Sequence, residues 1–169
     1  MDVQRVEERK QRLAESVGEF IKYWGFKEIH GRVWVHIYLS PKPITAKELT
    51  DRLGVTKGLI SIALSELLAY QVIEKVNIGN ARSPGYQSNT DLVEVINNVL
   101  RNRELKLTRK IQQNIVELSE EVNGADPQML TKLNKLREMT GFAVDTLTKL
   151  LENKTISVNR FKTIMRLIS

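Results

Sequence analysis

Residues 44–68, with the sequence ITAKELTDRLGVTKGLISIALSELL, contain the signals of two short helices joined by a tight turn. Thr45 and Glu48 have the T-x-x-E spacing of a capping box, in which each side chain satisfies a backbone N–H of the first helical turn. Gly54 can adopt the left-handed conformation that ends a helix, and Thr56 is a good N-cap residue for the next one. The segment is therefore predicted to form a helix-turn-helix, whose second helix can lie in a DNA major groove.

The second helix, predicted over residues 56–70, has two different sides at helical spacing. Its apolar stripe consists of Ile60, Ala63, Leu64, Leu67 and Leu68. Small side chains on the other side let the backbone approach a groove closely, and hydroxyls can reach phosphates or base edges. The predicted DNA-contacting residues of this helix are Thr56, Lys57, Gly58, Ser61 and Ser65. A helical hairpin with an ordinary solvated face is the alternative interpretation.

A β-hairpin is predicted directly after this helix. The segment 72–78 (VIEKVNI) alternates apolar and polar residues, 79–85 (GNARSPG) is rich in turn formers, and 86–88 (YQS) can return as a second strand. A helix-turn-helix followed by such a hairpin is a winged helix. Arg82 lies at the predicted tip of the wing, where its guanidinium can enter a minor groove or bind a phosphate. The alternative is a solvated arginine on a mobile loop.

The rest of the chain is predicted to be mainly helical, so the fold class is mainly α with one small β-hairpin. Residues 1–30 are predicted to form an N-terminal helix that contributes to dimerisation, with apolar residues at helical spacing over 3–24. Residues 31–90 form the winged helix domain, within which 31–40 fit a buried helix or a strand. Residues 91–169 are predicted to be a helical dimerisation region.

The dimerisation prediction depends on apolar seams that have no partner within one copy. Apolar residues recur at heptad-compatible intervals on two long helices after Asp91, and the second of these begins with Asp126 as N-cap and Pro127 at the first helical position. A last amphipathic segment follows over 157–169. A second copy of the chain is the simplest partner for these seams, and a helical hairpin within one copy is the alternative.

Charge and composition limit the partners and the compartment. The 169 residues carry a formal charge of +6, which suits a polyanionic partner such as double-stranded DNA. The absence of cysteine excludes disulfides and thiolate metal sites and fits a reducing cytoplasm. The N-terminus lacks the apolar core of a signal peptide, and no apolar run is long enough to span a membrane. We therefore expect a cytoplasmic protein without a membrane partner.

No enzyme signature is found, so neither catalytic residues nor cofactors are expected. His30 and His36 do not have the i, i+4 spacing of a helical zinc pair, and polar contacts within the fold are the expected role for both. Ser61 and Ser65 have no accompanying His and Asp, and the glycine-containing loop 79–85 is not followed by a P-loop lysine.

Aromatic residues are concentrated in one part of the chain. Packing in the core is one interpretation of this cluster. The other is a pocket for an apolar or cationic effector, because aromatic faces hold quaternary ammonium groups. The aromatic residues of the segment 20–38 are Phe20, Tyr23, Trp24, Phe26, Trp34 and Tyr38, and all of these except Phe26 are the candidate pocket residues.

Residues 13–90 resemble the GbsR/MarR-like branch of the MarR transcriptional regulators, which are winged-helix proteins. The resemblance depends on WGF (24–26), GRVWVHIYLS (31–40), PITAKEL (43–49), TKGLIS (56–61) and Arg82. It implies a homodimer formed by the N- and C-terminal helices, with the recognition helix and wing of each subunit on operator DNA. The recognition-helix motif is matched by Thr56, Lys57, Gly58 and Ser61, whereas Ser65 stands where the family usually has arginine. The wing also has fewer cations than is usual.

The expected function is that of a sequence-specific transcriptional regulator. It is predicted to be a dimeric repressor that binds a pseudo-palindromic operator through the recognition helix (56–70) and the wing (79–85). Gating by a small-molecule effector or by a regulatory protein partner is a further hypothesis, and some relatives in the branch are linked to choline and betaine metabolism. The alternative is a winged-helix protein-interaction module without direct DNA binding, which Ile62, Ser65 and the sparse wing favour.

Overall fold

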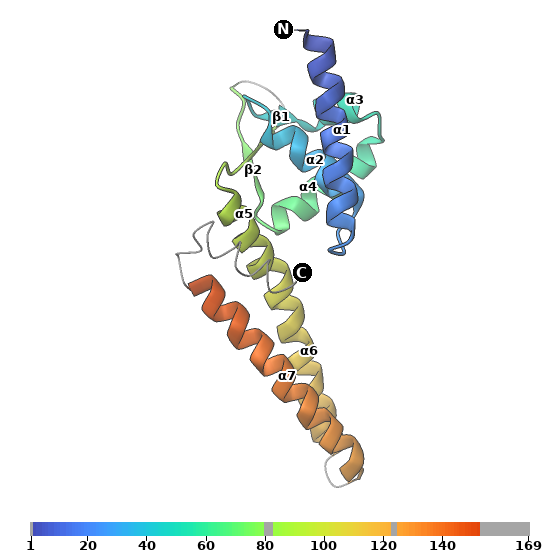
Figure 1. Ribbon diagram of the computed structural model, residues 1–169, viewed down its shortest axis with the longest axis vertical. Helices are drawn as coiled ribbons and strands as arrows, with labels where there is room; N and C mark the ends of the chain where they lie inside the picture. The colour runs from blue at the N-terminus through green and yellow to red at the C-terminus, as the bar shows by residue number, and fades with distance from the viewer. Residues whose placement is uncertain (1, 80–82, 123–124, 153–169) are drawn as a thin grey trace. The chain divides into compact units, whose positions relative to one another are not determined.

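The computed structural model describes residues 2–79, 83–122 and 125–152, and Figure 1 shows their helices and strands. The chain divides into two compact units, one up to Val95 and one from Ile96 onward. The secondary structure is mostly helical, with one small antiparallel sheet. This confirms the predicted fold class, a mainly α winged helix-turn-helix with additional long helices. Arg82, the predicted wing tip, and the predicted segment 157–169 lie outside the described residues.

The first unit begins with two helices that cross closely, α1 (Val3–Lys22) and α2 (Glu28–Tyr38). A Cβ atom on Gly31 of α2 would lie 2.7 Å from the Cα atom of Gly18 in α1. The absence of side chains at Gly18 and Gly31 therefore allows the backbones of α1 and α2 to approach this closely. Residues 31–40, which the sequence left open between helix and strand, are helical as far as Tyr38.

The helix-turn-helix consists of α3 (Ala46–Leu53) and α4 (Lys57–Ala69), and its local signals act as predicted. The Thr45 hydroxyl accepts a hydrogen bond from the Glu48 N–H, and the Glu48 carboxylate accepts one from the Thr45 N–H at 2.8 Å. Gly54 adopts a φ of +63°, the left-handed conformation that ends α3. The Thr56 hydroxyl accepts a hydrogen bond from the Leu59 N–H and so caps α4.

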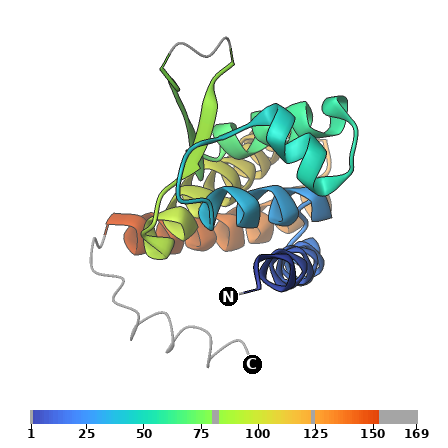
Figure 2. The same ribbon diagram turned by 90° about the horizontal axis from the view of Figure 1, so that it is seen from above.

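The sheet has three antiparallel strands in the order β1-β3-β2. The predicted hairpin is confirmed as β2 (Ile73–Val76) and β3 (Gly85–Ser88), which run side by side away from the helices of this unit in Figure 2. The additional strand, β1 (Ile44–Thr45), pairs Ile44 with Tyr86 and Thr45 with Gly85. Sequence reasoning missed β1 because two residues are too few to show an alternating pattern.

The core of the first unit lies between α2, α3 and α4. Its largest fully buried side chains include Ile44, Leu49 and Ile60, which come from β1, α3 and α4 respectively. The predicted apolar stripe of α4 is buried at Ile60, Ala63, Leu64 and Leu67, and half-buried at Leu68. The burial of this stripe fixes which side of α4 remains at the surface.

The second unit contains a helical hairpin, α6 (Leu105–Glu121) and α7 (Pro127–Glu152), whose helices lie side by side in Figure 1. Before it, α5 (Leu92–Val99) continues into a π-helical turn, η1 (Leu100–Glu104), which the spacing of apolar residues did not predict. Asp126 caps α7 as predicted, since its carboxylate accepts a hydrogen bond from the Met129 N–H at 2.9 Å. None of the helices described is long and apolar enough to cross a membrane.

Candidate nucleic-acid interface

The side of α4 opposite its buried stripe is an exposed surface, and the residues predicted to contact DNA lie on it. Within α4, Lys57, Gly58, Ser61 and Ser65 are all exposed, as is the capping residue Thr56. Ile62 is 52% exposed on the same helix, which adds an apolar group to this surface. The structure therefore brings the five predicted residues of α4 together, and we call this surface, from Thr56 to Ser65, the α4 face.

The N-terminal end of the α4 face has the features of an anion site. The first turn of α4, all of it described, contains no acidic residue and begins with Lys57. Backbone N–H groups at a helix N-terminus lack partners within the helix and favour negatively charged groups. The ammonium of Lys57 adds a full positive charge beside them. This end of α4 is suited to hold a phosphate.

Gly58 leaves open space on the α4 face. A Cβ atom built on Gly58 would meet no described atom within 4 Å, so the glycine is not required for packing inside the subunit. Its absent side chain shortens the distance at which another molecule can approach the helix backbone. This geometry fits the predicted close approach to a groove.

The described part of the hairpin carries a second exposed cation. Lys75 on β2 is exposed and lies opposite Tyr86 of β3, while its neighbour Glu74 accepts a hydrogen bond from Gln87 at 2.6 Å. Sequence reasoning singled out Arg82 and did not consider Lys75. Strict alternation along β2 predicts that one of the neighbours Glu74 and Lys75 is buried, whereas both are exposed. The strand pattern therefore gave no reason to select Lys75 as a surface cation.

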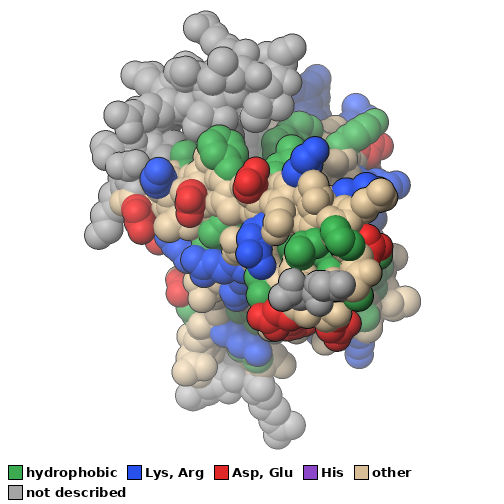
Figure 3. Space-filling view, turned by 90° about the horizontal axis from the view of Figure 1, so that it is seen from below, with side chains coloured by type: hydrophobic (Ala, Val, Ile, Leu, Met, Phe, Trp, Pro, Cys, Tyr) green, Lys and Arg blue, Asp and Glu red, His purple; other side chains and the backbone are tan. Residues whose placement is uncertain are grey.

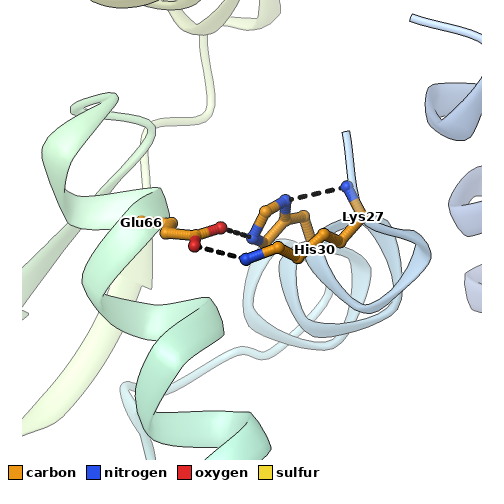
Figure 4. Close-up of polar contacts among 3 residues, drawn as sticks. All are labelled: Lys27, His30 and Glu66. Atoms are coloured by element: carbon orange, nitrogen blue, oxygen red, sulfur yellow. Dashed lines mark hydrogen bonds and ion pairs between the residues drawn. The ribbon is translucent and has the colours of Figure 1, made fainter. Parts of the chain in front are cut away.

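A polar cluster of Lys27, His30 and Glu66 fastens α4 to the start of α2 (Figure 4). The Glu66 carboxylate lies 2.5 Å from the Lys27 ammonium and 2.6 Å from Nε2 of His30. Nδ1 of His30 accepts a hydrogen bond from the Lys27 N–H, so in the neutral ring Nε2 is the nitrogen that carries the proton, and it faces the Glu66 carboxylate. The hydrogen bond from Lys27 is the main reason that the pKa of Glu66 lies below its usual value.

This cluster is partly shielded from water. The His30 side chain is only 3% exposed, and its ring meets the ring of Tyr70 edge-on at 6.3 Å. Phe26 meets both rings edge-on as well. The polar contact within the fold that was expected for His30 is confirmed. Sequence reasoning did not identify Glu66 as a member of this cluster, because Glu66 lies on α4, far along the chain from His30.

His36 is the second buried histidine, and it joins α2 to α1. Its Nε2 lies 3.1 Å from the side-chain oxygen of Gln11, which confirms the polar contact that was expected. Its Nδ1 is buried without a hydrogen-bond partner in the part of the chain that the structure describes. Burial holds the pKa of His36 below its usual value, and nearby Lys10 acts in the same direction. Among the described residues, no group of acidic, histidine or cysteine side chains is arranged to hold a metal ion.

We expect His36 to make the protein less stable in acid. Because the folded state resists protonation of the ring, the unfolded chain binds more protons as the pH falls below about 6.5, and the free energy of unfolding decreases. The charged groups that act on the ring are Lys10, Arg32 and Arg52, which oppose protonation, and Glu7, which favours it. Thermal melting between pH 7.5 and 5 measures the effect. The His36→Gln variant should lose stability less steeply over this range, and an equal slope would contradict the prediction.

The predicted aromatic cluster forms two separate ring pairs. Phe20 and Trp24 lie 6.3 Å apart on the α1 side, and Trp34 stacks on Tyr38 at 4.9 Å in α2. No ring contact between the two pairs is found in the described chain. Phe20, Tyr23 and Trp24 are 59%, 92% and 53% exposed, so core packing is wrong for these three residues.

Trp34 also has a polar contact within the fold. Its indole N–H donates to the Ser88 hydroxyl at 3.0 Å, and that hydroxyl donates to the carbonyl of Val72. The pair Trp34–Tyr38 is thereby held against β3. The five candidate pocket residues are thus not gathered around one point by the contacts that the structure shows, and the effector pocket stays a hypothesis.

Comparison with known proteins supports the class that α3, α4 and the hairpin define, which is the winged helix-turn-helix. No protein-family model matches the chain. The chain is 26% identical over 157 residues to the HTH-type transcriptional repressor OpcR of Bacillus subtilis, an alignment that covers 87% of this chain and 84% of that protein.

Two further similarities agree with this class. The putative HTH-type transcriptional regulator YvaV of Bacillus subtilis is 29% identical over 86 residues, which cover 51% of this chain and 49% of YvaV. A crystal structure of a transcriptional regulator matches with a TM-score of 0.74 and 16% identity, over 88% of this chain and 99% of that one. At that identity the solved structure shows the shared fold alone. The named relatives support a transcription regulator.

Proposed function

We propose that this protein is a transcriptional repressor of the GbsR/MarR-like type that binds operator DNA as a homodimer. The observation that carries the proposal is the α4 face, an exposed stripe of small and polar residues with Lys57 at its N-terminal end. The names of the two Bacillus subtilis relatives support the same function. No enzymatic activity, metal or cofactor is part of the proposal.

In this proposal the α4 face lies in a major groove. Lys57 and the first N–H groups of α4 hold a backbone phosphate, which positions the helix without reading sequence. The hydroxyls of Ser61 and Ser65 reach base edges, and exposed Ile62 contacts a thymine methyl group. Lys75 and Arg82 hold phosphates or the minor groove from the wing. Two α4 faces related by two-fold symmetry require a pseudo-palindromic operator.

A small-molecule effector is the proposed regulator of binding, and the exposed pair of Phe20 and Trp24 is its proposed contact. Both rings are more than half exposed, and they lie at the end of α1, close in sequence to Lys27 of the cluster that holds α4. An apolar or quaternary ammonium compound is the chemical class that such rings bind. A regulatory protein seated on the same rings is the alternative regulator.

The main test of the proposal is the salt dependence of DNA binding by the Lys57→Ala variant. We expect the variant to bind all duplexes more weakly. The magnitude of the slope of log affinity against log salt should fall by about 1, because one phosphate contact is lost. Fluorescence anisotropy with a random duplex and with a selected operator measures both quantities. Ser61→Ala should instead change the preferred sequence, at a cost of about 1–3 kcal/mol at one base pair.

The matched control is Lys132→Ala, which removes an exposed lysine of α7 and should leave the slope unchanged. A wild-type protein that binds no duplex at low salt would contradict the proposal. In that case the exposed apolar Leu59 and Ile62 of α4 favour the second candidate function, a protein-interaction module.

A further inference from the structure

Helix α6 keeps an apolar stripe at its surface. Leu107, Ile111 and Leu118 are 51%, 52% and 42% exposed, whereas Ile115 on the neighbouring side of the helix is buried. Together with exposed Asn114, the three apolar residues follow one another at intervals of four, three and four, which is the spacing of a coiled-coil seam. We call Leu107, Ile111, Asn114 and Leu118 the α6 seam.

Helix α7 of the same hairpin has exposed apolar residues as well. Leu136, Met139 and Phe142 follow one another at intervals of three and are 50%, 73% and 74% exposed. Figure 3 shows hydrophobic side chains reaching the surface between charged ones. Exposed apolar residues that are grouped along helices, rather than scattered singly, mark an interaction surface.

The α6 seam is self-complementary for two copies that run in opposite directions. Its four positions are symmetric about a point between residues 112 and 113. An antiparallel pair therefore places Leu107 against Leu118 of the partner subunit and Ile111 against Asn114 of the partner subunit. Each copy contributes the same four residues, as a two-fold interface requires.

The charges beside the α6 seam agree with the same direction and register. Lys110 and Glu117 are both exposed, and each directly precedes a seam residue, Ile111 or Leu118. In an antiparallel pair these two flanking positions face each other across the seam, so that Lys110 meets Glu117 of the partner subunit twice. Glu117 accepts a hydrogen bond from Gln113 through Oε1, which leaves Oε2 for the lysine. In a parallel pair in register, Lys110 would not face Glu117 of the partner subunit, and neither charge would have this partner.

We propose that a second copy of this chain covers the α6 seam, with the two α6 helices antiparallel and the two Lys110–Glu117 ion pairs closing its edge. The proposal rests on the homodimer of the proposed function and adds to it the helix, the direction and the register. Two observations assign the partner: the symmetric spacing of the four seam residues, and the opposite charges of Lys110 and Glu117 beside them.

Disulfide crosslinking tests the direction, since the chain has no cysteine of its own. The variants Leu107→Cys and Leu118→Cys are prepared separately, one of them with an affinity tag, then mixed and oxidised. We expect a crosslinked dimer only in the mixture. In a homodimer of either variant the two cysteines are separated by about 16 Å along the helices, which a disulfide cannot bridge.

Each result of the crosslinking experiment decides the proposal. Efficient crosslinking of either variant alone would show parallel helices and overturn it. No crosslink in the mixture, for variants that circular dichroism shows to be folded and sedimentation shows to be dimeric, would place the interface elsewhere, for example on the α1 rings. A wild-type monomer in sedimentation would contradict the homodimer itself, while the Lys57→Ala experiment tests DNA binding separately.

Charge reversal tests the register. The variants Lys110→Glu and Glu117→Lys should each raise the dimer dissociation constant about tenfold, because two symmetric ion pairs become two repulsions. The double variant Lys110→Glu/Glu117→Lys should restore the wild-type value. Arg109→Glu is the matched control, because Arg109 is also exposed on α6 but is not adjacent in sequence to any seam residue. An equal effect of Arg109→Glu, or no rescue in the double variant, would overturn the register.

Discussion

Replacing Glu66 with alanine is expected to lower the free energy of unfolding by about 2 kcal/mol and to weaken operator binding together with it. The loss follows because the His30 side chain is only 3% exposed, and without Glu66 its Nε2–H is left buried without an acceptor. The contact to Lys27 contributes much less, because the lysine side chain is 57% exposed and the pair is open to water. Urea denaturation and DNA binding measure the two effects.

Three further variants separate the contributions to this cluster. Glu66→Gln keeps an oxygen that accepts from His30, so it should be less destabilising than Glu66→Ala. Lys27→Ala should change stability by no more than about 1 kcal/mol. Glu74→Ala is the matched control, because it removes an exposed glutamate whose bond to Gln87 lies at the surface. Equal losses for Glu66→Ala and Glu74→Ala would contradict a special role for the buried histidine.

Replacing Gly31 with alanine is expected to destabilise the protein by about 3 kcal/mol and to loosen α1 from α2. The new Cβ atom would lie 2.7 Å and 2.8 Å from the Cα and N atoms of Gly18, which are backbone atoms that cannot rotate away. Thermal unfolding measures the loss, and limited proteolysis within α1 measures its release.

The opposite result is expected for the same substitution at Gly58. Because no described atom lies within 4 Å of the added Cβ atom, Gly58→Ala should stabilise α4 by about 0.5–1 kcal/mol, since alanine is the better helix former. Its added methyl group should nevertheless weaken binding to the operator, because it stands on the α4 face. A stabilised variant with unchanged operator affinity would mean that Gly58 does not approach DNA closely.

The parts of the fold that the sequence predicted well are those with local causes. Thr45, Glu48, Gly54 and Thr56 each act on backbone groups within a few residues, so spacing alone was sufficient to place α3, the turn and α4. The α4 face followed from the period of the buried stripe. These predictions needed no knowledge of which segments pack together.

The features that the sequence did not predict depend on residues far apart in the chain. Strand β1 exists because Ile44 and Thr45 pair with Tyr86 and Gly85, and nothing in a two-residue segment indicates this. Glu66 was not noticed, since its partners Lys27 and His30 belong to another helix. The exposed ring of Trp24 was equally unpredictable, because a high local density of aromatic residues does not say which rings reach the core.

The division of α4 into two stripes has a consequence for how such a protein changes in evolution. Ile60 and Leu64 support the fold and do not reach the surface, whereas Lys57, Gly58 and Ser61 support no packing that the described structure shows. Mutations on the exposed stripe can therefore alter which operator is recognised without passing through an unfolded intermediate. After gene duplication, two copies could diverge toward different target genes while every sequence between them remained a stable protein.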